Sequence, residues 1–550
     1  HRSIPLRQGA DKRSRKLHSL LWLQRRRLNM RESLVIGGVC AVICSHLLLV
    51  EAFFSYQPTC RFANDRGLRS SSSDNAVEED KEVKESGPRP LHQNWWPVTM
   101  SSAIDPSKPH SVELLGKKLV LWRCNGDDDD ELSCLDDQCA HRFAPLSEGR
   151  VVSTSDGGNR KCLQCAYHGW EFSGAGTCTR IPQLASSASY KPERTEPVSS
   201  YPVREAAGMV WVWPDMNSAD LAGSVSLPIS SLLERFDKVG GAKNGFMRDL
   251  PYGMEFLGEN LVDISHLPFS HHSVGALNRN DGRPVPLKML SESEREEVST
   301  KRGGGSRLPL FQAEVIDAAN HDPEVVAARK NPALQSDPDI AVSTVGFFDP
   351  CHVRYHRNPG VLGSSYEINL FMCPKSGGES RVFLHTPFES QISAMEKAMS
   401  GNDKDSEKAS ESERNMYKAS ILWKRGASAL FGRRTKQPPA FPPHMGHMIA
   451  HSIFDGDGIF LHKQGDRMHR SGLTYRDYRT PTSSDIAVNA FRRWLDSAAS
   501  VTREKGLQKA ADAVTGENYT YRDDLPRSQM LDRYTTHTAQ CKICLDALKG

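Results

Sequence analysis

Two short segments of the chain each pair a cysteine with a histidine. One residue separates Cys139 from His141, and two residues separate Cys165 from His168. Two thiolates and two imidazoles are a complete set of four ligands, which can hold a tetrahedral zinc ion or a [2Fe-2S] cluster. Cys162 stands at Cys-x-x-Cys spacing from Cys165, so a redox dithiol is a third interpretation of the second segment.

The order of the ligands favours the cluster. Zinc fingers usually place both cysteines in one half of the motif and both histidines in the other. Here each half holds one cysteine and one histidine, as a cluster needs when each loop must reach both irons. Histidine ligands raise the reduction potential, which suits a cluster that passes electrons to an oxygen-activating site. Cys162 and Cys178 are then predicted to be packed thiols rather than ligands.

A second group of candidate ligands lies in GENLVDISHLPFSHH, residues 258–272. On a helix, Asp263 and His266 would share a face, because residues three apart are neighbours there. His271 adds a second histidine at His-x4-His spacing. Two histidines and one carboxylate form the facial triad of non-haem Fe(II) oxygenases, which leaves positions open for O2. A capping-rich loop with surface histidines is the alternative interpretation.

The sequence around the first four ligands resembles a known family. CAHRFAPLSEGRV and CAYHGWEF are similar to the two cluster loops of Rieske oxygenases, and GAGTCTRIPQ is similar to the plastid group that includes pheophorbide a oxygenase and chlorophyllide a oxygenase. The resemblance covers roughly residues 92–545. It implies that Cys139, His141, Cys165 and His168 bind a Rieske [2Fe-2S] cluster. It also implies an α+β fold, in which a small all-β Rieske domain precedes a START-like catalytic domain of helices over an antiparallel sheet.

The same resemblance implies roles for the second group. His266 and His271 are expected to bind a mononuclear Fe(II), with O2 as the co-substrate. Asp263 is expected to link the Rieske histidine of one subunit to the iron site of its neighbour, which implies a homotrimer. Asn260 is expected to support this link. His272 is the weaker candidate ligand.

The carboxylate ligand of the iron must come from farther along the chain. HSIFDGDGIFLHKQ, residues 451–464, holds an acidic residue just before an apolar helical run, as in the family. We expect Asp457 to be the ligand, with Asp455 as the second candidate.

The end of the chain, LDRYTTHTAQCKIC, carries Cys541 and Cys544 at Cys-x-x-Cys spacing. Such a pair can form a disulfide and act as a redox switch when one thiol is exposed and has a lowered pKa. Two inert cysteines are the alternative, and one such pair cannot complete a zinc site. The pheophorbide a oxygenase group carries the same pair, usually followed by membrane helices. The resemblance therefore implies peripheral or C-terminal membrane association.

The N-terminal part of the chain is predicted to be a targeting segment. Met30 opens a charged segment and an apolar run, and a Ser- and Arg-rich stretch follows. This order is similar to the two-part presequences of algae with secondary plastids, which implies a plastid protein at the envelope or thylakoid membrane. An N-terminal membrane anchor is the alternative. The predicted units are a non-native extension (1–29), a presequence and linker (30–91), the Rieske domain (92–216) and the catalytic domain (217–550), with polar insertions at about 290–335 and 400–415.

The net charge and the lack of a convincing nucleotide-binding motif limit the possible partners and the source of electrons. The net charge is only +3 and the basic excess is mostly N-terminal, so we expect no nucleic-acid partner. The chain has no convincing GxGxxG or P-loop motif, so electrons must come from an external donor, and the family uses ferredoxin. The expected activity is oxygenation of a pheophorbide a or chlorophyllide a type tetrapyrrole. The alternatives are an import-associated redox component of the plastid envelope and a zinc-stabilised binding protein.

Overall fold

The described part of the chain begins after the predicted presequence. The predicted segments up to residue 87, and most of both polar insertions, lie outside the described residues. The computed structural model is described for residues 88–549, with the exception of 125–130, 155–159, 186, 275–276, 283, 302–306, 317–342, 358–364, 401–441 and 518–524.

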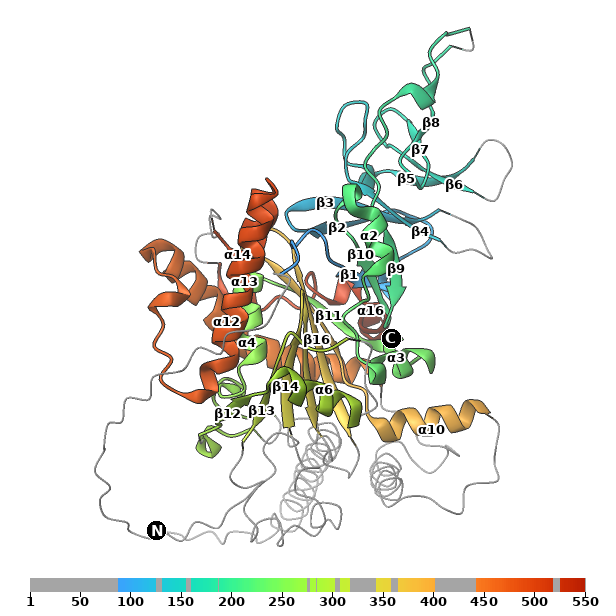
Figure 1. The fold of residues 1–550 in the computed structure, drawn as a ribbon. Helices are drawn as coiled ribbons and strands as arrows, with labels where there is room; N and C mark the ends of the chain where they lie inside the picture. Colours follow the sequence, from blue (N-terminus) through green and yellow to red (C-terminus); the bar gives the residue numbers. More distant parts are fainter. Residues whose placement is uncertain are drawn as a thin grey trace, which may run out of the picture.

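The first part of the fold is built from three small antiparallel sheets. In Figure 1 these sheets form the upper end of the molecule, with β5 to β8 outermost. A separate hydrophobic core lies between the β2–β3–β4 and β5–β8 sheets and includes Trp122, Leu135, Leu163 and Phe172. The strands are β1 (Trp96–Met100), β10 (Met209–Val212) and β9 (Val203–Ala206); β2 (His110–Leu114), β3 (Lys117–Arg123) and β4 (Leu132–Asp136); and β5 (Arg150–Ser153), β6 (Lys161–Gln164), β7 (Glu171–Phe172) and β8 (Cys178–Arg180).

The second part is centred on one seven-stranded antiparallel sheet. Its middle strands are buried and rich in apolar residues, because both faces are covered. The order across the sheet is β11 (Phe246–Leu250), β17 (Ser380–His385), β16 (Tyr366–Pro374), β15 (His352–Arg357), β14 (Ser343–Phe348), β13 (Phe311–Val315) and β12 (Leu287–Met289).

Helices cover this sheet, and α4, α12, α13 and α14 gather on one side of it in Figure 1. The contact is aromatic: Phe347 on β14 meets Phe491 and Trp494 of α13 edge to face, with ring centroids 5.3 and 4.7 Å apart. The α+β class with helices over an antiparallel sheet is therefore confirmed. The helices are α2 (Ala219–Ser224), α3 (Ser231–Lys238), α4 (Met254–Val262), α5 (Leu267–Ser270), α6 (Glu292–Lys301), α10 (Glu389–Ser400), α12 (Pro443–Ser471), α13 (Ile486–Glu504), α14 (Gln508–Thr515), α15 (Arg527–Met530) and α16 (Lys542–Lys549).

One expected insertion is partly a piece of the sheet. Segment 290–335 contains α6 and then β13, where Phe311 and Ala313 are buried. β13 pairs with β12 and β14, so residues 311–315 belong to the sheet and not to a surface loop. Polar residues surround this short strand in the sequence, and polar Gln312 is itself buried within it. The predicted domain boundary after residue 216 falls at the start of a short 3-10 helix, Met216–Ser218, and stays a prediction.

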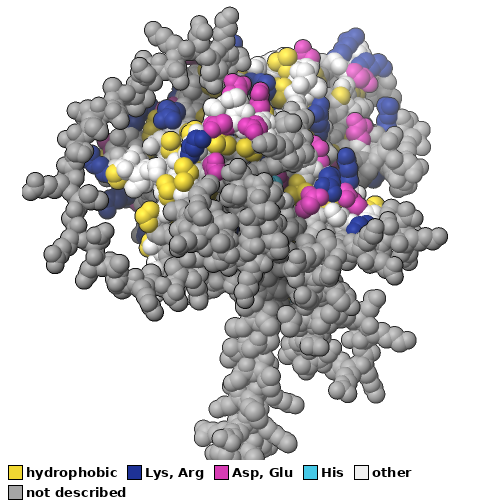
Figure 2. Space-filling view, turned by 60° about the horizontal axis from the view of Figure 1, so that its bottom comes forward, with side chains coloured by type: hydrophobic (Ala, Val, Ile, Leu, Met, Phe, Trp, Pro, Cys, Tyr) yellow, Lys and Arg dark blue, Asp and Glu magenta, His cyan; other side chains and the backbone are white. Residues whose placement is uncertain are grey.

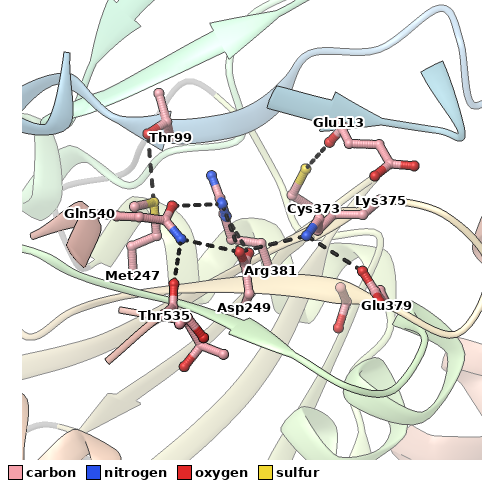
Figure 3. Close-up of polar contacts among 12 residues, drawn as sticks. Thr99, Glu113, Met247, Asp249, Cys373, Lys375, Glu379, Arg381, Thr535 and Gln540 are labelled. Atoms are coloured by element: carbon pink, nitrogen blue, oxygen red, sulfur yellow. Dashed lines mark hydrogen bonds and ion pairs between the residues drawn. The ribbon is translucent and has the colours of Figure 1, made fainter. Parts of the chain in front are cut away.

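The two parts share a continuous interface. Trp211 of β10 meets Phe371 of β16 edge to face at 5.6 Å, inside one core that includes residues of both parts. Figure 3 shows the polar contacts at this joint, where the Arg381 guanidinium bonds both oxygens of Asp249 and also donates to the Val98 carbonyl over 2.8 Å. Buried apolar and charged contacts together therefore join the β1–β10–β9 sheet to the seven-stranded sheet.

Two surface properties bear on partners. On the described part of the face in Figure 2, Lys and Arg side chains lie among Asp, Glu and apolar side chains, with no large area of one sign. Within the described ranges, none of the helices is both long and apolar enough to cross a membrane.

Candidate metal centres

The first cysteine–histidine loop, residues 139–144, is closed by its own backbone. The Cys139 amide donates to the Ala144 carbonyl over 2.8 Å, and the Phe143 amide donates to the Cys139 carbonyl over 2.9 Å. Phe143 has a φ of +61°, which a phenylalanine rarely adopts, and its side chain is 73% exposed. The turn is therefore held by the backbone bonds, not by packing of Phe143, and strain of this kind is common at functional sites.

The second loop, residues 165–170, repeats this geometry. The Cys165 amide donates to the Trp170 carbonyl over 2.8 Å, and the Gly169 amide donates to the Cys165 carbonyl over 3.0 Å. Gly169, at φ +72°, takes the position that Phe143 has in the first loop. The two segments therefore form matched turns that each start with a cysteine.

The matched turns bring two thiols and two imidazoles together. Cys139 and Cys165 are buried, whereas His141 and His168 are half-buried, with ring centroids 4.5 Å apart. The His141 ring stacks on Trp170 at 4.6 Å. This layout, with sulfur below and imidazole towards the surface, suits a cluster whose iron–histidine side faces a partner.

Two observations fit a positively charged group between the loops. Burial, with Cys165 close by, raises the pKa of Cys139 to about 11, so its thiolate needs a compensating charge. The Nδ1 atom of His141 is buried without a hydrogen-bond partner among the described residues. The other two nearby cysteines lie within strands, with Cys162 in β6 and Cys178 in β8, and both are buried.

Asp263 and His266 do not lie on one helix, although their spacing suggested a shared helical face. α4 ends at Val262, and Asp263 is extended, with φ −87° and ψ 120°. The Ser265 amide and hydroxyl both donate to Asp263 Oδ1 over 2.7 Å, and such side-chain turns compete with helix. A new short helix, α5, starts after His266, with Pro268 in its first turn. The Asp263–His266 contact is therefore made across a turn.

Three side chains converge at the end of this turn. His271 Nε2 lies 3.3 Å from Asp457 Oδ2, and His266 Nε2 lies 3.8 Å from the same oxygen. The three ligand atoms all lie within 4.8 Å of one another. Asp457 and His271 are buried, and neither ring nitrogen of His271 has a hydrogen-bond partner among the described residues. The set therefore fits a divalent cation, in the two-histidine, one-carboxylate arrangement of mononuclear iron sites.

The remaining candidate ligands have other partners. Asp455 accepts from Arg248 over 2.7 Å and from Arg533 over 2.9 Å, so it is held in an ion-pair network outside the triad. His272 Nδ1 accepts the Arg279 amide over 3.3 Å. Of the two aspartates, the structure brings only Asp457 to the histidines.

Two polar side chains contact the His266 ring. Asp263 Oδ2 lies 3.4 Å from its Nδ1 atom, and Asn260 Nδ2 lies 3.3 Å from its Nε2 atom. Burial alone raises the pKa of Asp263, but hydrogen bonds from His266 and Ser265 outweigh it and hold that pKa below its usual value. Asp263 therefore stays ionised, and it orients the His266 ring.

A small apolar cavity adjoins the triad. Its volume is about 110 Å³, and the sheet and the two helices α4 and α12 wall it. The three triad residues form its polar end, while its other walls are almost wholly apolar. Its lining includes Leu267, Leu277, Tyr355, Ile368, Leu370, Leu384, Ile453 and Phe454.

The structure also shows a cluster that the sequence did not predict. His447 of α12 and His537 lie against Cys541 and Cys544, and all four ligand atoms are within 4.8 Å of one another. Among the described residues both cysteines are free. A local signal was present, because His537 stands four residues before Cys541, but nothing in the sequence links His447 to the tail.

Comparisons with known proteins agree with this geometry. Residues 94–202 match the model of the Rieske [2Fe-2S] domain. The chain is 30% identical to the chloroplastic pheophorbide a oxygenase of Arabidopsis thaliana, over 89% of this chain and 77% of the relative. It is 39% identical to the same enzyme of Oryza sativa subsp. japonica, over 82% and 72%. It is 25% identical to the chloroplastic protein TIC 55 of Pisum sativum, over 83% and 70%.

Proposed function

The chain belongs to the plastid group of Rieske-type non-haem iron oxygenases, and we propose that it uses O2 to oxygenate a chlorophyll-derived tetrapyrrole of the pheophorbide a or chlorophyllide a type. Two relatives named pheophorbide a oxygenase, at 30% and 39% identity over most of the chain, support this substrate class. The family's cofactors are the [2Fe-2S] cluster and a mononuclear iron. The single observation that carries the proposal is the triad of His266, His271 and Asp457, two of them buried, at the end of an apolar cavity.

The matched loops would hold the cluster, with Cys139 and Cys165 on one iron and His141 and His168 on the other. The loops' backbone bonds fix both cysteines in place before any metal is bound. The cluster supplies one electron at a time, and the proposed donor is ferredoxin. The half-buried imidazoles form the side on which a partner would dock.

His266, His271 and Asp457 would hold the mononuclear iron, whose chemistry is the activation of O2. Asp457 offers a carboxylate oxygen in a buried position, where a cation gains most from such a ligand. The unpartnered nitrogens of His271 are ready to ligate without breaking any hydrogen bond. Asp263 would keep the proton of His266 on Nδ1, which leaves Nε2 free to face the iron.

Asp263 would also be the contact between subunits. Figure 1 places β5 to β8 far from α4 and α12, so the cluster loops and the triad of one chain lie well apart. The side chain of Asp263 is 27% exposed, which leaves its carboxylate open to a histidine of another copy. A homotrimer in which each cluster serves the neighbouring iron accounts for both features.

The cavity limits how a substrate is held. Its volume of about 110 Å³ is below the roughly 300–1,000 Å³ of most ligand pockets. We therefore place only the reacting edge of the tetrapyrrole in it, against the apolar walls formed by Ile368, Leu370 and Leu384. The rest of the macrocycle would lie outside the walls that these residues form.

The experiment that tests this function is a single turnover with defined substrates. The protein is reduced anaerobically with ferredoxin, mixed with a panel of chlorophyll derivatives, and exposed to ¹⁸O2. We expect one derivative to gain labelled oxygen, read by mass spectrometry. A reduced protein that reoxidises at the same rate with and without every derivative, and labels none, contradicts the proposal.

One specific observation favours a second candidate. The similarity to protein TIC 55 extends over 83% of the chain, so a redox component of the import-associated type remains the alternative role. In that case O2 uptake would not depend on a tetrapyrrole. The relatives' chloroplastic names support a plastid location, and we propose the envelope or thylakoid membrane as the site of action.

A further inference from the structure

The cluster at the C-terminal end of the chain is built from three separate parts of the sequence. His447 comes from the first turns of α12, His537 precedes a 3-10 helix, Thr538–Gln540, and Cys541 and Cys544 open α16. His447 Nδ1 lies 3.3 Å from Cys544 Sγ and 3.5 Å from Cys541 Sγ. His537 Nε2 lies 3.2 Å from Cys544 Sγ.

These separations match the edges of a tetrahedral site. Zinc–sulfur bonds of about 2.3 Å and zinc–nitrogen bonds of about 2.0 Å give sulfur–nitrogen edges of about 3.5 Å. The three observed separations of 3.2, 3.3 and 3.5 Å fall at or slightly below this value. Two thiolates and two imidazoles are also a donor set that zinc accepts, and here all four ligand atoms lie within 4.8 Å of one another, as around a single ion.

In each of the two histidine rings, the nitrogen that faces away from the sulfurs bonds a backbone carbonyl. Histidines that bind metals are usually held in this way. His447 Nε2 donates to the Asn244 carbonyl over 3.1 Å, and His537 Nδ1 donates to the Met247 carbonyl over 2.5 Å. A carbonyl only accepts, so these nitrogens carry the protons. The inner nitrogens are then bare lone pairs aimed at the sulfurs, and the tautomers are set by backbone carbonyls just before β11 and within it.

Hydrogen bonds among neutral side chains do not satisfy this arrangement. Cys544 Sγ is close to two bare nitrogens, yet a thiol has one proton and can donate to only one of them. If Cys541 donates to His447 and Cys544 to His537, the contact of 3.3 Å between Cys544 and His447 sets one lone pair against another. A cation at the centre turns every one of these contacts into a favourable one.

We infer that His447, His537, Cys541 and Cys544 bind one zinc ion in a closed, four-ligand structural site, distinct from both iron centres. Binding releases the two thiol protons to solvent and involves no change in oxidation state. With all four positions taken by protein, the ion has no open place for a substrate.

The proposed site ties the tail to the helix that carries the triad. His447 and Asp457 are ten residues apart on α12, or about 15 Å along the helix axis. The tail is also fixed next to the site, where Figure 3 shows Gln540 bonded to Arg381 and Asp249. The ring of His537 stacks on Phe246 of β11 at 4.7 Å. The zinc would thus hold α12 against the first strand of the sheet.

The test measures zinc in the purified holoprotein. We expect about one zinc per chain beside the iron, and Cys544→Ser should lose it while the iron and sulfide contents stay unchanged. The matched control is Cys124→Ser, which removes a buried thiol outside the cluster, where its Sγ lies 3.4 Å from the Glu131 carbonyl, and which should keep the zinc. Zinc that persists in a Cys541→Ser, Cys544→Ser double variant would be adventitious and would overturn the assignment.

A measurement on the wild-type protein covers the case in which the variants do not fold. X-ray absorption at the zinc edge should show two sulfur ligands at about 2.3 Å and two nitrogen ligands at about 2.0 Å. Protein that holds its iron but no zinc, or whose tail peptide carries a Cys541–Cys544 disulfide by mass spectrometry, contradicts the site. In that case the redox pair is the correct interpretation of the tail.

Discussion

His271 Nε2 lies 3.3 Å from Asp457 Oδ2, although the two residues come from separate elements, the end of α5 and the middle of α12. Both side chains are buried, and the histidine has no hydrogen bond of its own among the described residues. A buried imidazole and a buried carboxylate arranged in this way are costly without a shared partner. The positions of His271 and Asp457 therefore indicate a metal-binding site between their side chains.

Gly456 allows the middle of α12 to approach the end of α5 closely. A Cβ atom on Gly456 would lie 2.8 Å from the Ser270 carbonyl oxygen and 3.0 Å from His271 Nδ1. We therefore expect Gly456→Ala to push His271 away from Asp457 and to lower the occupancy of the mononuclear iron several-fold. Iron analysis against acid-labile sulfide measures this, because the cluster supplies an internal standard.

Gly458 is the matched control for that variant. It lies on the same helix, and a Cβ atom there would meet only Tyr252, at an ordinary 3.8 Å. Gly458→Ala should keep its iron and gain up to about 1 kcal/mol of helix stability. Equal loss of iron in both variants would show that helix α12 tolerates no side chain there, and the argument from His271 would fail.

Asp263→Asn should separate metal binding from turnover. The amide keeps the shape of the side chain but removes the charge that orients His266 and faces a second subunit. We expect both iron centres to stay filled and turnover to fall by about two to three orders of magnitude. Stopped-flow oxidation of the cluster should slow equally, whereas Asp466→Asn, at an aspartate of α12 that pairs with Arg470, should leave both rates unchanged. Normal turnover in Asp263→Asn would exclude the bridging role.

Asp455 is expected to stabilise the fold without binding iron, whereas Asp457 is expected to bind iron. The Arg248 side chain, only 2% exposed, pairs with Asp455 at 2.7 Å. Asp455→Ala removes the carboxylate that pairs with this buried charge, which should cost about 3–5 kcal/mol of unfolding free energy. Urea unfolding measures the loss, and the iron content of the folded variant should be unchanged. If Asp455→Ala instead loses one iron and keeps its stability, the ligand assignment is reversed.

His352 should make the catalytic domain sensitive to acid. Burial, with Arg354 nearby, lowers the pKa of its ring to about 3 in the folded chain, against about 6.5 when unfolded. Because the unfolded chain binds the proton first, this stability is present above pH 6.5 and is lost as the pH falls towards 3. Between pH 7 and pH 5 the wild type should lose about 2 kcal/mol more than His352→Gln.

Urea unfolding at the two pH values, followed by tryptophan fluorescence, measures this difference. Glutamine keeps a donor for the Asn369 oxygen that accepts from His352 over 3.0 Å. His469→Gln, at an exposed position on α12, should behave as the wild type does. Identical pH dependence of the wild type and His352→Gln would rule out this source of acid sensitivity.

The sequence predicted those site residues whose spacing is local. Cys139 with His141, and Cys165 with His168, each sit in one short turn, so spacing alone identified them as candidate ligands. The break of α4 at Asp263 was not predictable, because Ser265 and Pro268 act together with tertiary contacts to end the helix. His447 could not be linked to Cys544 either, since only the packing of α12 on the tail brings them together. Strand β13 was hidden for the same reason, because FQAEV includes polar residues and only pairing with β12 and β14 places it in the sheet.

The most direct test of the account is the iron and acid-labile sulfide content of Asp457→Ala beside the wild type. Two separate iron centres predict about three irons and two sulfides per wild-type chain. Asp457→Ala should keep two irons and both sulfides, with an unchanged Rieske electron paramagnetic resonance signal. A variant that keeps all three irons, or a wild type with only two, would contradict the mononuclear site at His266, His271 and Asp457.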